Sequence, residues 1–136
     1  MTLGQEALKC LQEGNCRFIS GIFSSNIVSH QDRRNELAAR QESFAIILGC
    51  SDSRAPTEII FDQGLGKLFV IRVDGNIVAP SQVGCLGFAA ERFSTILVVV
   101  GHLKCGAILA TIEVLKSHPE TSPEIYIRSL IVSAHQ

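Results

Sequence analysis

The sequence has no surplus of charge of either sign. Its 12 Lys and Arg residues nearly balance 13 Asp and Glu residues, which leaves a formal net charge of -1 at pH 7. A surface that binds nucleic acid normally gathers basic residues into a patch that neutralises phosphates, and no such patch is visible along this chain. The composition therefore argues against a nucleic acid as partner.

The chain also lacks a long apolar run and a secretory signal pattern. A helix that crosses a bilayer needs roughly 20 consecutive apolar residues, and no run approaches that length. Residues 1–6 do not show the charged-then-apolar order of a signal peptide. We find no internal repeat, low-complexity tract or linker. With 136 residues and 46% hydrophobic content, we expect one soluble, cytoplasmic domain without a membrane partner.

A disulfide framework is not indicated either. The cysteines number five, an odd count, and they are not dense in a chain of this length. There is no Cys-x-x-Cys, so a redox role for Cys50 and Cys105 is the weaker interpretation. Reduced thiols in a cytosolic setting, some of them holding a metal, fit the pattern better.

Strand-like and helix-like segments alternate along most of the chain. Near-continuous apolar runs, typical of strands covered on both faces, occur at residues 44–48, 67–73 and 95–100. Between them, Pro56 and Pro80 are placed as first helical residues, and residues 107–116 repeat apolar positions at helical spacing. This alternation predicts an α/β fold with a central, mostly parallel sheet flanked by helices.

An N-terminal helical arm precedes the predicted sheet. Residues 2–5 have the form of a capping box, and apolar residues then follow at helical spacing, with an interruption near Gly14. A second helix is expected at residues 35–40. We expect residues 1–40 to form this arm, which covers the sheet of its own subunit or reaches onto a partner, and residues 41–136 to form the sheet core.

Two polar hexads come directly after predicted strands. Residues 49–54 read Gly-Cys-Ser-Asp-Ser-Arg, and residues 101–106 read Gly-His-Leu-Lys-Cys-Gly. If both strands are parallel, Cys50, His102 and Cys105 emerge at the carboxyl edge of one sheet, where open α/β folds bind ligands. Two thiolates and one imidazole favour zinc. Three protein ligands leave an open position, which is typical of a catalytic rather than a structural zinc site.

Asp52 and Arg54 lie beside the first of these cysteines. At positions i and i+2 their side chains can point the same way, so the arginine fork can clamp the carboxylate and keep it ionised. Asp52 would then accept a hydrogen bond from zinc-bound hydroxide. If the clamp releases, Asp52 becomes a fourth ligand and closes the site; the residues themselves leave both states open.

These motifs resemble those of the β-class carbonic anhydrases. The pair is Cys-x-Asp-x-Arg at residues 50–54 and His-x-x-Cys at residues 102–105. The similarity extends to residues 62–72 and 75–80, which look like the second-strand region of the family, and to residues 6–21, which resemble its N-terminal helix. It covers nearly the whole chain.

The resemblance implies a function. By it, Cys50, His102 and Cys105 would be ligands of one Zn²⁺ per subunit, with Asp52 and Arg54 as the catalytic dyad. The enzyme would be a carbonic anhydrase, a lyase in which zinc hydroxide attacks carbon dioxide and gives bicarbonate and a proton.

The resemblance also implies substrate contacts and an assembly. Gln41 matches a position that hydrogen-bonds substrate, Phe69 matches an apolar wall of the carbon dioxide pocket, and the Gly106 amide would meet the bound anion. Members of the family are homodimers or larger homo-oligomers with active sites at the subunit interface, so the same is expected here.

One departure concerns the end of the chain. Relatives continue beyond the position of Gln136, so the single zinc-binding domain over residues 1–136 is expected to have an incomplete sheet core, with an exposed edge strand and apolar helix faces. His30, His118 and His135 are interpreted as solvated, so none is an obvious proton shuttle. Two alternatives remain open: a catalytically silent zinc-binding module, and a hydrolase of carbonyl sulfide or carbon disulfide that shares the metal site.

Overall fold

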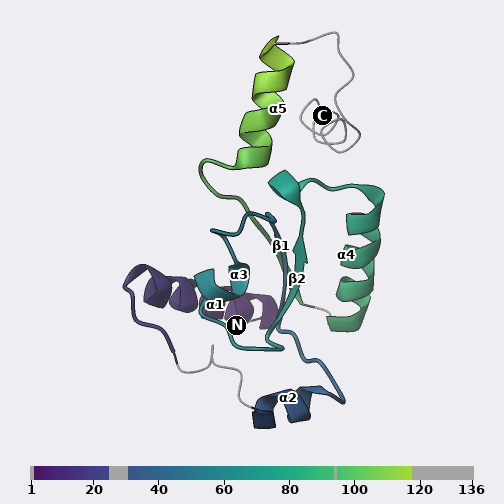
Figure 1. The fold of residues 1–136 in the computed structure, drawn as a ribbon. Helices are drawn as coiled ribbons and strands as arrows, with labels where there is room; N and C mark the ends of the chain where they lie inside the picture. The colour runs from purple at the N-terminus through teal and green to yellow at the C-terminus, as the bar shows by residue number, and fades with distance from the viewer. Residues whose placement is uncertain (1, 25–30, 94, 118–136) are drawn as a thin grey trace.

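The computed structural model describes residues 2–24, 31–93 and 95–117; His30, His118 and His135 lie outside them. In chain order, the elements are α1 (Leu3–Ile19), α2 (Gln31–Leu37), β1 (Ala45–Gly49), α3 (Thr57–Ile60), β2 (Leu68–Arg72), the 3₁₀ turn η2 (Asp74–Asn76), α4 (Pro80–Phe93), β3 (Ile96–Val100) and α5 (Gly106–Ser117). Figure 1 shows their arrangement. No helix among these residues is both long and apolar enough to cross a membrane.

The strands form a parallel sheet in the order β2-β1-β3. All five residues of the central strand β1 are buried, which explains why its sequence is apolar without alternation. The three strands are in step, so Gly49 pairs with Arg72 on one side and with Val100 on the other. The predicted α/β class and parallel sheet are confirmed, and all three strands end at one edge.

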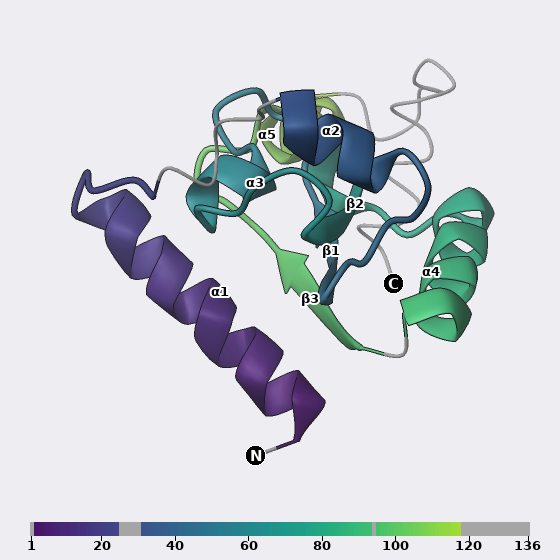
Figure 2. The same cartoon turned by 90° about the horizontal axis from the view of Figure 1, so that it is seen from below.

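Helices cover both faces of the sheet. Helices α1 and α3 lie on one side and α4 lies on the other (Figure 2). Leu11 of α1 belongs to the same buried cluster as Ala45 and Ile47 of β1, whereas Phe69 of β2 packs against Phe88 of α4 with ring centroids 6.1 Å apart. Helix α1 therefore packs on the sheet of its own chain.

Helix α1 is continuous, so the predicted interruption near Gly14 is wrong. Gly14 is buried, and a Cβ at that position would lie 1.8 Å from the carbonyl oxygen of Phe61. The glycine is a point of close approach between α1 and the end of α3. Next to it, the Asn15 side chain donates to the Ile60 carbonyl over 3.1 Å. The capping box at Thr2 is formed as predicted.

An ion pair with a buried carboxylate attaches the C-terminal end of α1. The Asp62 side chain is fully buried and accepts hydrogen bonds from Arg17 and, over 3.0 Å, from the Ser24 amide. Burial raises the pKa of Asp62, but the hydrogen bonds from Arg17 and Ser24 outweigh it, so this pKa lies below its usual range. The pair therefore stabilises the fold above the ordinary Asp pKa and is lost only as the pH falls through the lowered value.

Two helix boundaries differ from the prediction. Pro56 is the N-cap of α3 rather than its first residue, whereas Pro80 does open α4 as predicted. The second helix spans Gln31–Leu37 rather than residues 35–40. The polar segment around it carries no apolar periodicity that could set its ends.

Apolar surface remains exposed at one side of the sheet. Strand β3 is an edge strand among the described residues, and its Leu97 and Val99 side chains are exposed. Helix α5 extends away from the end of the sheet (Figure 1), with Ile108, Leu109 and Ile112 exposed along it. The expected exposure of an edge strand and of apolar helix surface is thus present in the described part of the chain.

A matched pair of glycine substitutions tests the α1 contact. Gly14→Ala should destabilise the protein by about 1–3 kcal/mol, because the new methyl group collides with backbone. Gly87 lies in α4 with open space around it, so Gly87→Ala should stabilise by about 0.5–1 kcal/mol through helix propensity alone. Urea unfolding followed by circular dichroism measures both, and equal effects in the two variants would contradict the packing at Gly14.

Candidate metal centre

The loops that follow β1 and β3 meet at the carboxyl edge of the sheet. Cys50 leaves β1 directly, and His102 and Cys105 follow β3 after one glycine. The ligand atoms of these three residues all lie within 4.8 Å of one another. Because β1 and β3 are adjacent and end at the same level, residues 55 positions apart in the chain come into contact.

The geometry of the three side chains fits a metal ion. The Cys50 and Cys105 sulfur atoms are 3.7 Å apart, far beyond the roughly 2.05 Å of a disulfide. Two thiolates about 2.3 Å from a tetrahedral zinc would lie about 3.8 Å apart, close to that separation. The third donor is Nε2 of His102, which is buried and has no hydrogen-bond partner.

A backbone contact orients the His102 ring. Its Nδ1 lies 3.1 Å from the carbonyl oxygen of Leu103. A carbonyl can only accept, so Nδ1 carries the proton and Nε2 keeps its lone pair for a metal. The orphaned atom is therefore in the chemical form that ligation requires.

The surroundings of Cys50 favour its thiolate. Burial raises the pKa of this thiol, but the hydrogen bonds from the Asp52 and Gly75 amides, together with the neighbouring His102 and Cys105 side chains, lower it more, so the net pKa is lowered. Both amides donate to the sulfur over 3.4 Å. In turn, Cys50 raises the pKa of His102. A thiolate is the form of cysteine that binds metals.

Asp52 is clamped by Arg54 as the sequence predicted. The guanidinium donates from Nε to Oδ1 over 2.9 Å and from Nη2 to Oδ2 over 2.7 Å, and the Arg54 amide donates to Oδ1 over 2.9 Å. These bonds hold the pKa of Asp52 well below its usual range. The carboxylate is thus ionised, and its Oδ2 lies 3.9 Å from Nε2 of His102.

Arg54 also joins the two metal loops. Its Nη2 donates to the carbonyl oxygen of Lys104 over 3.0 Å. Lys104 adopts a left-handed backbone with φ of 55°, a conformation that non-glycine residues seldom take. One guanidinium therefore fixes the Asp52 carboxylate relative to the loop that carries His102 and Cys105.

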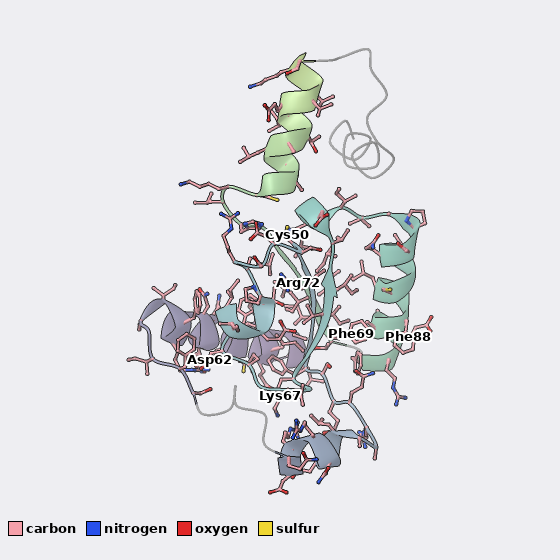
Figure 3. All side chains as sticks on the ribbon, viewed as in Figure 1. Cys50, Asp62, Lys67, Phe69, Arg72 and Phe88 are labelled. Carbon is pink, nitrogen blue, oxygen red and sulfur yellow. The ribbon has the colours of Figure 1, made fainter. Side chains whose placement is uncertain are left out.

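The structure adds two residues that the sequence analysis did not single out. Arg72 donates to the carbonyl oxygens of Cys50 and Asp52, and the Asn76 side chain donates to that of Val100 over 2.5 Å. Figure 3 shows Arg72 beside Cys50. A signal was present in the sequence, since both residues follow the apolar run of β2 at the sheet edge that holds the hexads.

Of the three predicted substrate-binding residues, one lies at this centre. Gly106 begins α5 directly after Cys105. Gln41 instead precedes β1 at the opposite edge of the sheet, where it lines a cavity with Arg92 and Phe93. Phe69 pairs with Ile46, three residues before the strand end, or roughly 10 Å from it, and Figure 3 shows it facing α4. Neither residue reaches the metal centre of its own chain.

Comparison with known proteins agrees with this geometry. A family model described as carbonic anhydrase matches residues 45–136. The crystal structure of a β-carbonic anhydrase from Aspergillus fumigatus superposes with a TM-score of 0.64 at 26% sequence identity, over 97% of this chain. This chain belongs to the β-carbonic anhydrase family. The family is zinc-dependent, so the three ligand atoms point to zinc as the ion that this centre would hold.

Two further relatives describe how far the similarity extends. Carbonic anhydrase 2 of Mycobacterium tuberculosis is 40% identical over 128 residues, which cover 92% of this chain and 59% of that protein. A tetrameric β-carbonic anhydrase of Sordaria macrospora matches 74% of this chain with a TM-score of 0.52 and 26% identity. This chain spans 59% of the length of the mycobacterial carbonic anhydrase 2 and 54% of the Aspergillus chain.

Zinc content tests the ligand set. Cys105→Ala should weaken zinc binding by more than about 100-fold, because loss of a ligand exceeds the usual effect of losing an outer-shell partner. Cys16→Ala is the control, since Cys16 is exposed on α1 and away from the centre. Zinc per chain after dialysis against a chelator measures the difference, and a Cys105→Ala protein with full zinc would disprove the assignment.

Proposed function

We propose that this chain catalyses the reversible hydration of carbon dioxide to bicarbonate and a proton. The observation that carries the proposal is the placement of an ionised, arginine-clamped carboxylate beside the three ligand atoms. Asp52 Oδ2 lies 3.9 Å from Nε2 of His102. His102 Nε2 forms the set of three possible metal ligands together with the sulfur atoms of Cys50 and Cys105. A purely structural zinc site fills its fourth position with a protein ligand, whereas Arg54 engages both oxygens of the Asp52 carboxylate and would hold it away from that position.

Cys50, His102 and Cys105 would hold zinc and leave one position for solvent. Zinc bound there would supply a hydroxide nucleophile near neutral pH, because it lowers the pKa of water to about 7. A reducing compartment such as the cytoplasm suits this centre, because both ligand thiols have to stay unoxidised.

Asp52 would orient the nucleophile. Its carboxylate can only accept hydrogen bonds, so a hydroxide beside it has to point its proton at Asp52 and a lone pair at the substrate carbon. Arg54 prevents the carboxylate from taking up that proton, because its bonds keep the pKa of Asp52 low. The amide of Gly106, at the start of α5, would donate to the bicarbonate formed.

A second copy of the chain would supply the remaining substrate contacts. Gln41 and Phe69 lie away from the metal centre of their own chain, so they serve catalysis only if they face the centre of another subunit. The tetrameric state of the Sordaria relative and the exposed Leu97 and Val99 support a homo-oligomer. Its interface would cover that apolar surface.

Stopped-flow hydration of carbon dioxide tests the reaction. Turnover of the wild-type protein should scale with bound zinc and rise with pH. Asp52→Asn should keep zinc and lower kcat by about 10- to 100-fold, because the amide can donate and no longer fixes the direction of the hydroxide proton. Asp32→Asn on α2, where the carboxylate is exposed, should leave kcat unchanged.

The pH dependence of turnover shows whether Asp52 itself titrates in the pH range of the assay. The lowered pKa of Asp52 means that this carboxylate does not titrate between about pH 6 and pH 9. The Asp52→Asn profile should therefore show no additional titration, and its midpoint should move to lower pH, because loss of a neighbouring negative charge favours deprotonation of solvent held at the centre. Full zinc without turnover in the wild-type protein would favour the silent zinc-binding module instead.

Mixing two variants of reduced activity tests the shared active site. Gln41→Leu lacks the proposed partner residue and Asp52→Asn lacks the dyad. If Gln41 serves the neighbouring subunit, a mixed dimer contains one intact site, and random exchange should restore up to roughly a quarter of wild-type activity. If Gln41 served its own subunit, no mixed dimer would hold an intact site and activity would stay at the sum of the two variants.

A further inference from the structure

The loop that carries Cys50 and Asp52 is held through its main chain. After Gly49 the parallel pairing with β2 continues for one more step, since the Ser51 amide donates to the Val73 carbonyl over 3.3 Å. Beyond Ser51 the chain turns back toward α3. Two carbonyl oxygens, those of Cys50 and Asp52, face the end of β2 at this turn.

Arg72 satisfies both carbonyls with one side chain. Its Nε donates to the Cys50 oxygen over 2.8 Å and its Nη2 donates to the Asp52 oxygen over 2.6 Å. The position follows from the register, because Arg72 pairs with Gly49 and so stands next to Cys50. The planar fork of arginine can bridge two acceptors at a fixed spacing, which the single ammonium of lysine cannot reproduce.

The contacts of Arg72 complement those of Arg54. Arg54 holds the Asp52 carboxylate and the Lys104 carbonyl, whereas Arg72 holds the main chain on either side of Ser51. Asp52 is therefore fixed at its side chain by one arginine and at its backbone by the other. The segment after Arg72 adds to the same loop, since the Gly75 amide donates to the Cys50 sulfur.

We propose that Arg72 is a positioning residue of the metal centre. By fixing the carbonyls of Cys50 and Asp52 it holds the first thiolate and the dyad carboxylate at a set spacing, without touching either group. The effect on turnover rests on the function proposed above, whereas the effect on metal binding does not.

Zinc affinity of three variants tests the proposal. Arg72→Gln keeps at most one of the two bonds and should weaken zinc binding by about 10- to 100-fold, the usual cost of losing a partner that orients a ligand. Arg72→Lys keeps the charge without the fork and should fall between Arg72→Gln and wild type. Lys67→Gln is the control: Lys67 is exposed directly before β2 at the opposite edge of the sheet (Figure 3), and its removal should change nothing.

The measurements are competition with a chromophoric chelator for zinc, the visible spectrum of the cobalt-loaded proteins, and thermal unfolding by circular dichroism. A weaker affinity and an altered cobalt spectrum in Arg72→Gln, with Lys67→Gln as wild type, support the proposal. Unchanged affinity and spectrum in Arg72→Gln overturn it, and so does an equal loss in Lys67→Gln. Full recovery in Arg72→Lys overturns the bridging role, because charge alone would then suffice.

The same variants and measurements also cover two other cases, a variant that does not fold and a wild-type protein without turnover. If Arg72→Gln does not fold, the Arg72→Lys variant tests the proposal in its place. Weaker zinc binding in Arg72→Lys than in wild type would then support the positioning role of Arg72, and unchanged zinc binding would overturn it. In the hydration assay, Arg72→Gln should lower kcat more than it raises KM. If the wild-type protein binds zinc without turnover, the proposed function fails, and the zinc affinities and cobalt spectra still test Arg72.

Discussion

The centre depends on one constraint, the in-step ending of three parallel strands. Gly49, Arg72 and Val100 stand side by side across the sheet, so the segments that follow them leave from the same edge. That single register places Cys50, the η2 turn and the His102 loop next to one another. A shift of one residue in β1 would turn its side chains to the opposite face, and the thiolate would no longer face Cys105.

The local problem at this edge is the concentration of negative charge. Two cysteine sulfurs, which bind a metal as thiolates, lie beside one carboxylate, and such groups repel when ionised unless each is compensated. Backbone amides compensate Cys50, and Arg54 compensates Asp52. The metal would complete the balance. The Arg72 side chain binds the main chain of the same loop, at the carbonyl oxygens of Cys50 and Asp52. The two arginines therefore contact different groups of one short segment.

The single chain holds only part of what the proposed reaction requires. The metal ligands and the dyad meet at one edge of the sheet, whereas Gln41 and Phe69 lie toward the other edge, near the C-terminal half of α4. Strand length enforces this separation, because β1 lies between Gln41 and Cys50 and an extended strand rises roughly 3.3 Å per residue. In the proposed function, a centre that uses both Gln41 and Cys50 would therefore combine two subunits.

The sequence by itself determined the α/β class, the parallel strands, the capping box and the meeting of Cys50 with His102 and Cys105. Each of these follows from a local pattern: uninterrupted apolar runs, a cap spacing, or a polar hexad placed directly after a strand. It also indicated the Asp52–Arg54 clamp, because both groups lie within one turn.

Only the tertiary structure decided the features that depend on contacts between distant segments. Gly14 reads as a helix breaker in sequence, yet it is the place where α1 touches the Phe61 carbonyl. Arg72 reads as the polar end of a strand, yet it bridges two carbonyls of the metal loop. In both cases the partner is backbone, whose position no residue identity encodes, so the role of the side chain emerges only when the sheet register brings that backbone beside it.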